Sequence, residues 1–131
     1  MNSKKFLPGE NKGDQSKNSL PNCEVRTLIE FDRASKRLTK KYFSLSDEIE
    51  KLVVELRQNP TKGTPIGRSC YKIRLAIKSK GKGKSGGARV ITHYYIHGET
   101  VYLISIYDKA EQATIPEATI TELLQKIEEL G

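Results

Sequence analysis

The sequence contains few cysteines and begins with a polar stretch that lacks any long apolar run. Two cysteines in 131 residues, Cys23 and Cys70, are too few for a disulfide scaffold, and we expect both to be reduced structural thiols. Residues 1–22 are polar, contain two prolines and have no apolar run of the kind found in signal peptides or membrane segments. We therefore expect a disordered leader over residues 1–22, no contact with a membrane and a cytoplasmic protein.

Acidic residues are absent from one long stretch, and that absence localises the charge of the protein. The chain has 23 lysines and arginines against 16 acidic residues, which gives a formal net charge of +7. Seven of the basic residues lie in the 19 residues from Tyr71 to Arg89, where there is no aspartate or glutamate. The other 16 basic residues balance the 16 acidic residues of the chain. A polyanion would be attracted to this one segment, and nucleic acid is the polyanion that basic proteins most commonly meet.

Alternation within the basic segment predicts a β-strand with one apolar and one cationic face. Apolar residues occupy every second position from Tyr71 to Ile77, and they alternate with Lys72, Arg74, Ala76 and Lys78. The glycines of residues 79–87 permit many backbone angles, and the lysines among them repel one another. We expect a mobile hairpin tip that becomes ordered only on an anion. Its candidate RNA contacts are Lys78, Lys80, Lys82 and Lys84.

Similar patterns predict strands outside the basic segment. Residues 25–31 alternate between apolar and polar side chains, which predicts a short first strand. Two apolar-rich stretches, ARVITHYYI from Ala88 and VYLISIY from Val101, follow the basic strand after short connections. Short connections favour antiparallel neighbours, so we expect three consecutive antiparallel strands in the second half of the chain.

Three helices are predicted from capping residues and apolar spacing. Asp32 follows the first strand and is suited to cap a first helix, while Ser44 and Asp47 resemble a capping box at the start of a second. The second helix ends before Pro60, and Pro116 is a preferred first-turn residue for a last helix. The second helix turns an apolar stripe toward the core, formed by Leu45, Ile49, Leu52, Val53 and Leu56.

The resulting order of elements is β-α-α-β-β-β-α. This order predicts an α+β protein in which a mainly antiparallel sheet packs against helices. The length suits a single domain, and residues 23–131 are enough to bury one modest core between sheet and helices.

Two nucleotide-binding patterns and one metal-binding pattern occur without the context that each requires. The glycines of residues 81–86 satisfy G-x-G-x-x-G, but a strand-forming segment follows them where a helix is needed. The segment 83–85 ends like a P-loop, yet the first glycine of that motif and its helix are missing. His93 and His97 would lie about 13 Å apart on a strand, too far for one zinc ion. We expect neither a cofactor nor a metal.

Three motifs resemble the RelE/HigB toxins of bacterial type II toxin–antitoxin pairs. They are KIR from Lys72 to Arg74, SKGKGKSGGARVI from Ser79 to Ile91, and VYLISIYDKAE from Val101 to Glu111. The resemblance covers about residues 24–130 and implies the compact RelE-like fold for residues 23–131. It further implies an mRNA interferase that enters the A site of the 30S ribosomal subunit and cuts the message there, and an antitoxin protein that neutralises it.

The resemblance also implies a set of catalytic residues. Lys72 and Arg74 match the basic pair on the family's second strand, Arg89 matches the arginine that opens the third, and Lys109 holds the basic position after the fourth. Well-known RelE members carry a tyrosine several residues further on, whereas no tyrosine follows Tyr107 here. The HigB-like pattern IY-x-K gives that role to Tyr107 or Lys109. Packing of Tyr107 against the last helix is an equally good interpretation.

These residue types suit cleavage of RNA without a metal. The 2′-hydroxyl of RNA is the nucleophile, so the reaction needs a base for its proton, cations for the charge at the phosphorus centre and an acid for the leaving oxygen. Arginine binds phosphate oxygens in a forked geometry. Lysines whose pKa is lowered by neighbouring cations exchange protons. The candidate catalytic residues are therefore Arg74, Arg89, Lys109, Tyr107 and Lys72.

Two alternatives share these sequence features. A non-catalytic nucleic-acid-binding module would keep the lysine-rich loop and tolerate lysine in place of Arg74 or Arg89. A ParE-like gyrase inhibitor would share the fold, but its activity does not need a nuclease cation cluster. For the interferase we expect three partners, namely an antitoxin, mRNA and the ribosome with its rRNA, and no small-molecule cofactor. We also expect the acidic last helix to frame or mask the basic sheet, and an acidic antitoxin segment to cover the sheet or displace that helix.

Overall fold

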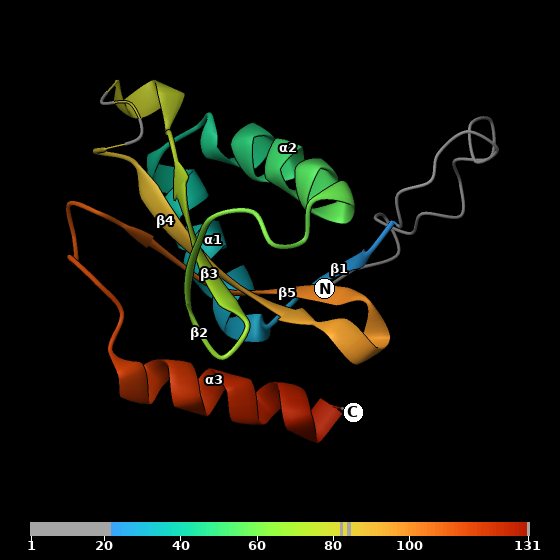
Figure 1. Cartoon of the computed structure of the whole chain (residues 1–131). Coiled ribbons are helices and arrows are strands. Elements are labelled where there is room, and N and C mark those ends of the chain that lie inside the picture. Colours follow the sequence, from blue (N-terminus) through green and yellow to red (C-terminus); the bar gives the residue numbers. More distant parts are fainter. Residues whose placement is uncertain (1–21, 82, 84, 131) are drawn as a thin grey trace, which may run out of the picture.

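The computed structural model describes residues 22–81, 83 and 85–130, and Figure 1 shows the arrangement of its elements. The predicted leader, residue 22 excepted, and the candidate RNA contacts Lys82 and Lys84 lie outside the described residues. The elements in chain order are β1 (Glu24–Thr27), α1 (Ile29–Lys41), α2 (Leu45–Gln58), β2 (Thr64–Gly67), β3 (Cys70–Leu75), the 3₁₀ turn η3 (Lys78–Lys80), β4 (Ala88–Tyr95), the 3₁₀ turn η4 (Ile96–Gly98), β5 (Thr100–Asp108) and α3 (Glu117–Leu130).

The five strands form one sheet in the order β1-β5-β4-β3-β2. β1 runs parallel to β5, and the other neighbouring pairs are antiparallel. The central strands β4 and β5 are buried over most of their length, as expected of strands with neighbours on both sides. The α+β prediction with a mainly antiparallel sheet is therefore confirmed.

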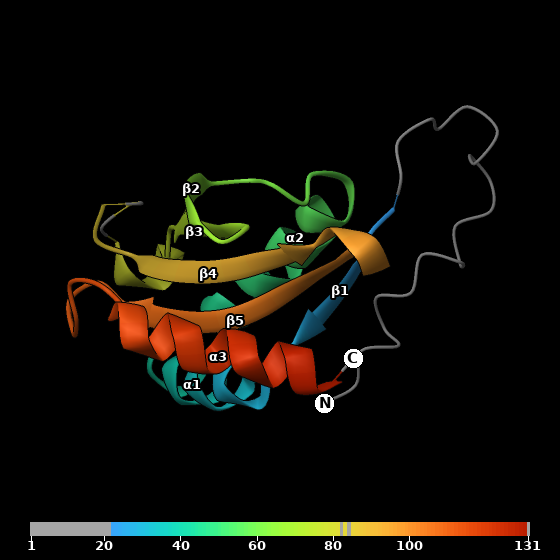
Figure 2. The ribbon, with the colours of Figure 1, turned by 60° about the horizontal axis from the view of Figure 1, so that its bottom comes forward.

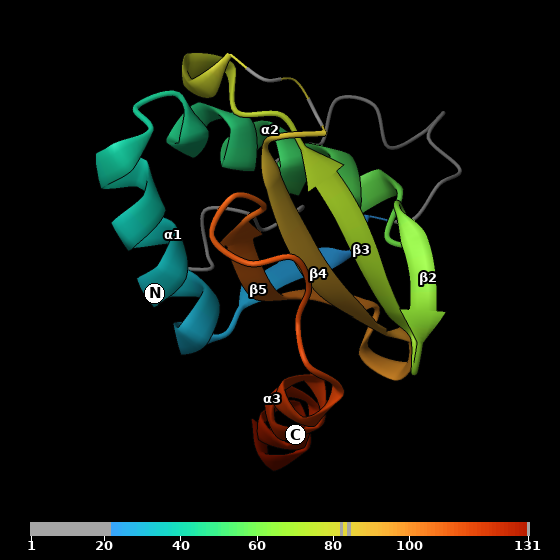
Figure 3. The ribbon, with the colours of Figure 1, turned by 90° about the vertical axis from the view of Figure 1, so that its left-hand side faces the viewer.

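Helices cover both faces of the sheet, as Figure 3 shows. α1 and α2 pack on one face, where Leu38 and Leu52 join the inward side chains of β3, β4 and β5 in a single apolar cluster. α3 packs on the other face, where Ile120, Leu123 and Ile127 contact a second cluster (Figure 2). The alternation predicted for β3 is present, because Ile73 belongs to the first cluster while Lys72 and Arg74 lie on the α3 face.

The short strand β2 was missed by the sequence prediction. Its four residues, TPIG, contain a proline and a glycine, which are disfavoured in strand interiors, and carry no apolar alternation. β2 sits at the sheet edge, where proline is tolerated. It joins β3 through Arg68 and Ser69, whose φ angles of 57° and 59° give the mirror-image turn that two-residue hairpins prefer. Glycine or asparagine normally marks that turn, so its signature is absent from the sequence.

Two predicted helix caps were wrong, although the helices themselves are present. α1 begins one turn earlier than predicted, with Leu28 at the N-cap position, so Asp32 lies within its first turn. Ser44 does occupy the N-cap of α2, but its hydroxyl forms no capping bond and instead contacts Glu48 and Ser79. The apolar stripe of α2 points into the core as predicted.

Both cysteines are buried and free. Burial raises the pKa of the Cys70 thiol to about 11, so the thiol stays protonated at neutral pH. None of the helices in the described ranges is long and apolar enough to cross a membrane.

Candidate functional site

The register of the sheet brings the predicted arginines together. Arg74 on β3 pairs with Arg89 on β4, and Arg89 pairs in turn with Tyr107 on β5. Directly paired residues point to the same face of a sheet, so these side chains form a row across three strands on the α3 face. Lys72 lies two residues before Arg74 and shares that face. Lys109 follows β5, and its backbone N–H donates to the Gly87 carbonyl oxygen at 3.0 Å, which fixes the turn beside β4.

Four of the five predicted catalytic residues line one hollow of about 260 Å³, which we call the basic hollow. Strands β2, β3 and β4 and the segment after β5 contribute to its wall. Its charged side chains are all cationic, so it concentrates positive potential in a concave surface, where a phosphate group would be attracted most strongly. The residues that line it are Thr64, Ile66, Lys72, Arg74, Arg89, Lys109 and Ala113.

The cations of the basic hollow differ in how firmly the protein holds them. Arg89 is only 5% exposed, and its guanidinium donates to the carbonyl oxygens of Ala88 and Ser85 at 3.1 and 3.3 Å. Arg74 and Lys109 are exposed, and Lys72 is half-buried. The hollow therefore combines one preorganised guanidinium at its floor with three more accessible cations around it.

Tyr107 is not among the residues that line the basic hollow. It is 3% exposed and packs with Ile115, Ile120 and Leu123 in the cluster beneath α3. Burial raises the pKa of Tyr107, and Arg89 and Thr114 only partly oppose that effect. The surroundings of Tyr107 are those of an aromatic residue packed between the sheet and the last helix.

Hydrogen bonds connect the start of the lysine-rich loop to α2. The backbone N–H of Lys78 donates to Glu48 Oε2 at 2.7 Å, and that of Ser79 donates to Ser44 Oγ at 2.9 Å. These bonds hold the η3 turn against the start of α2. A buried glutamate distant in the sequence thus supplies an acceptor at the start of the loop, and the anion-dependent ordering of residues 79–87 stays a prediction.

Lys80 is directed away from the basic hollow. Its ammonium forms an ion pair with Asp108 Oδ1 at 2.5 Å, and its side chain is only 11% exposed. The same ammonium lies 5.4 Å from the centroid of the Tyr42 ring at the end of α1. Lys80 thus serves the α1 side of the sheet, in a structural role that its place in the loop did not indicate.

Asp108 is the residue near the site that sequence reasoning missed. It is fully buried, and its carboxylate accepts hydrogen bonds from Lys80, from the Tyr42 hydroxyl at 2.7 Å and from the Ala110 backbone at 2.9 Å. Burial raises the pKa of Asp108, but these hydrogen bonds outweigh burial and the net pKa is lowered. Asp108 therefore fixes the turn that presents Lys109. A lone aspartate directly after a long apolar strand was the available signal.

Solved structures resemble this chain in fold. No family model matches the sequence. A chain of the toxin–antitoxin complex RelBE2 from Mycobacterium tuberculosis matches with a TM-score of 0.50 and 18% identity, over 71% of this chain and 97% of that one. A double arginine-to-alanine mutant of the E. coli toxin RelE in the free state matches with a TM-score of 0.52 and 19% identity, over 81% and 98%. The chain has the RelE fold.

The last helix of this RelE fold is tied to neighbouring elements by exposed polar contacts. Arg68 of the β2–β3 turn donates to Glu117 Oε1 at 2.7 Å and to Thr121 Oγ1 at 2.8 Å, and Lys126 pairs with Glu30. These exposed contacts connect α3 to the β2–β3 turn and to α1. Among the described residues, none of α3 reaches the basic hollow, so the predicted masking by α3 is absent from this structure.

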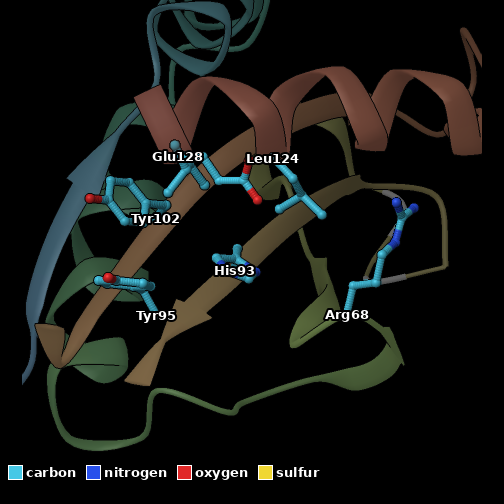
Figure 4. A pocket seen from close by; sticks show the side chains of 7 residues that line it. Arg68, His93, Tyr95, Tyr102, Leu124 and Glu128 are labelled. Atoms are coloured by element: carbon cyan, nitrogen blue, oxygen red, sulfur yellow. The ribbon is translucent and has the colours of Figure 1, made fainter. Parts of the chain in front are cut away.

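A larger hollow of about 480 Å³ lies under the C-terminal half of α3, and Figure 4 shows its lining. His93 lies at its centre, with Tyr95 and Tyr102 toward one end and Arg68 at the other. Burial lowers the pKa of His93, so this imidazole is neutral at pH 7. Arg68 is already paired with Glu117, and Glu128 adds a negative charge. The smaller basic hollow, by contrast, is lined by four cations and no carboxylate among the described residues.

Proposed function

We propose that this protein is the toxin of a type II toxin–antitoxin pair and acts as a ribosome-dependent mRNA interferase. The observation that carries the proposal is the convergence of Lys72, Arg74, Arg89 and Lys109 on the basic hollow. Two strands, β3 and β4, and the turn after β5 bring these cations together, although up to 37 positions separate them in the sequence. Such a cluster stabilises the charge that develops at phosphorus during RNA cleavage.

The residues of the basic hollow divide into two chemical roles. Arg74 and Arg89 bind phosphate oxygens through their forked guanidinium groups and so stabilise charge. Proton transfer falls to Lys72 and Lys109. One lysine removes the proton of the 2′-hydroxyl, and the 2′-oxygen then bonds to phosphorus. The bond from phosphorus to the 5′-oxygen breaks, and the second lysine protonates the leaving oxygen. The products are a 2′,3′-cyclic phosphate and a 5′-hydroxyl.

The partners of the proposed function are an antitoxin, mRNA and the A site of the ribosome, in the cytoplasm. The matched chain from M. tuberculosis belongs to a structure named as a toxin–antitoxin complex, which supports an antitoxin partner. The ribosome would hold the message in position over the basic hollow, because a single small site positions a flexible message poorly.

A reconstituted bacterial translation reaction with a defined message tests this function. We expect primer extension to detect cuts within codons that require both ribosome and protein. Arg74→Ala and Lys109→Ala should each lower the cleavage rate by about 10²–10³-fold, the usual cost of removing one group that stabilises transition-state charge. Lys36→Ala is the matched control, because Lys36 is an exposed α1 lysine away from the hollow. Intact message with the wild-type protein would contradict the proposal.

A non-catalytic RNA-binding module is the second candidate. It is favoured by the lining of the basic hollow, which contains no histidine, carboxylate or tyrosine among its described residues, and by the burial of Tyr107. A hollow lined only by cationic and neutral side chains binds phosphate but offers no carboxylate or imidazole as a base. Tight, salt-sensitive RNA binding together with uncut message would establish this second function.

A further inference from the structure

A second cationic hollow lies on the other side of Arg74. This edge hollow, between α2 and β3, also has a volume of about 260 Å³. Its cations are Lys51, Lys62, Arg74 and Lys78, and its floor contains the apolar side chains of Leu52 and Ile73. No residue of the edge hollow other than Arg74 belongs to the basic hollow.

The outer edge of β3 is paired over only part of its length, and the chain at Gly63 lies against Lys72 and Ile73. β2 pairs with β3 only from Cys70 to Lys72. Among the described residues, no further strand covers the outer edge of β3 from Ile73 to Leu75. The exposed Arg74 lies at this edge, which no strand pairs in the described ranges, and it lines both hollows. An extended chain leaving the basic hollow can therefore pass over Arg74 without crossing a strand.

The charges of the edge hollow favour an anion. Its two carboxylates are already engaged, since Glu48 accepts from the Lys78 backbone and the Ser44 hydroxyl, and Glu55 pairs with Lys62 at 3.4 Å. Within the described part of the chain, no ion pair engages the ammonium groups of Lys51 and Lys78. The bond to Glu48 also fixes the backbone of Lys78, so this lysine is held at the rim in advance of binding.

We infer that single-stranded RNA bound in the basic hollow continues over Arg74 into the edge hollow, where its phosphates contact Lys51, Lys62 and Lys78. The apolar floor of that hollow receives a ribose or base, as in other grooves that track single strands. This inference rests on the proposed function, and it adds a direction for the bound RNA strand and a second contact region on α2. The occupant is RNA, because the site is continuous with the basic hollow and matches a repeating negative charge.

Oligonucleotide length provides the test. Fully 2′-O-methylated RNAs, which lack the nucleophile, are bound to the full-length protein in short (about four nucleotides) and long (about twelve nucleotides) forms. The variant Lys51→Ala/Lys78→Ala should weaken binding of the long form about tenfold or more and leave the short form unchanged. Its slope of log affinity against log salt should fall by about 0.7 for each phosphate that the variant no longer binds. Lys36→Ala/Lys40→Ala on α1 removes equal charge and is the control.

The outcomes separate this inference from the proposed function. The wild-type protein binding short and long RNAs equally, or both double variants weakening the long form alike, would show that the edge hollow is not part of the RNA path. The function proposed for the basic hollow would stand in either case. If neither form binds, free RNA occupies neither hollow and the inference is overturned, whereas the proposed function is decided separately by cleavage of the message in the translation reaction. If Lys51→Ala/Lys78→Ala loses binding of a poly-glutamate peptide but not of RNA, the edge hollow serves an acidic protein segment and the inference is overturned.

Discussion

The buried carboxylate of Asp108 gives the sharpest prediction about stability. Asp108 is fully buried and joins three parts of the structure, through Lys80, through Tyr42 and through the turn after β5. Asp108→Ala leaves the ammonium of Lys80, whose side chain is 11% exposed, without its partner. Removing one member of a buried ion pair typically costs about 3–5 kcal/mol, because the remaining charge stays desolvated. We expect a loss of this size in the free energy of unfolding.

Chemical denaturation of a double-mutant cycle measures this effect. The free energy of unfolding is determined for the wild type, Asp108→Ala, Lys80→Met and the double variant. Because the double variant leaves no unpaired charge, it should be less destabilised than the sum of the two single variants, by about 1–3 kcal/mol. A destabilisation by Asp108→Ala of less than about 1 kcal/mol, or strict additivity, would show that the pair does not hold the loop and the turn together.

Three further predictions concern single residues. Because the pKa of Asp108 is lowered in the folded protein, its ionised carboxylate adds stability that is fully present above the unfolded pKa of about 3.9. This stability is lost as the pH falls through the folded pKa. Asp108→Asn should therefore lose less stability in acid than the wild type, as measured by denaturation at each pH. Cys70, buried with a pKa of about 11, should react with a thiol reagent at pH 8 only after unfolding, and rapid labelling of the native protein would refute its burial. Tyr107→Phe should leave RNA cleavage nearly unchanged, whereas Tyr107→Ala should lower the free energy of unfolding by about 3–5 kcal/mol. A large loss of cleavage in Tyr107→Phe would instead show that the Tyr107 hydroxyl takes part in catalysis.

The apolar patterns of the strands made most of the fold predictable from the sequence. β3, β4 and β5 are recognisable because burial on one or both faces demands apolar residues at fixed positions. The connections between consecutive strands favour antiparallel pairing. The pairing of β3 with β4 places Arg74 opposite Arg89. The cation cluster was predictable for the same reason. Strand β2 was not, because an edge strand of four residues has no buried alternation to reveal it.

Long-range polar contacts explain what the sequence could not reveal. Lys80 and Asp108 are 28 residues apart, and nothing in either segment indicates that they meet in a buried ion pair. Glu48 looks like one more charge on an exposed helix face, yet it anchors the loop at Lys78 across 30 residues. A charge pattern read along the chain treats such residues as solvated, whereas burial turns them into structural links. Lys78 and Lys80 consequently have different surroundings although they appear equivalent in sequence.

Arg89 offers the most direct test of the central claim that the basic hollow cleaves RNA. Arg89→Lys keeps the charge but removes the forked guanidinium, which is anchored at the floor of the hollow by two carbonyl oxygens. The measurement is the rate of message cleavage in a stalled ribosome complex under single-turnover conditions, with circular dichroism to verify the fold. The account predicts cleavage by the wild type, ending in a 2′,3′-cyclic phosphate, and a loss of about 10²-fold or more in Arg89→Lys. An uncut message with the wild type, or equal rates for both proteins, would contradict it.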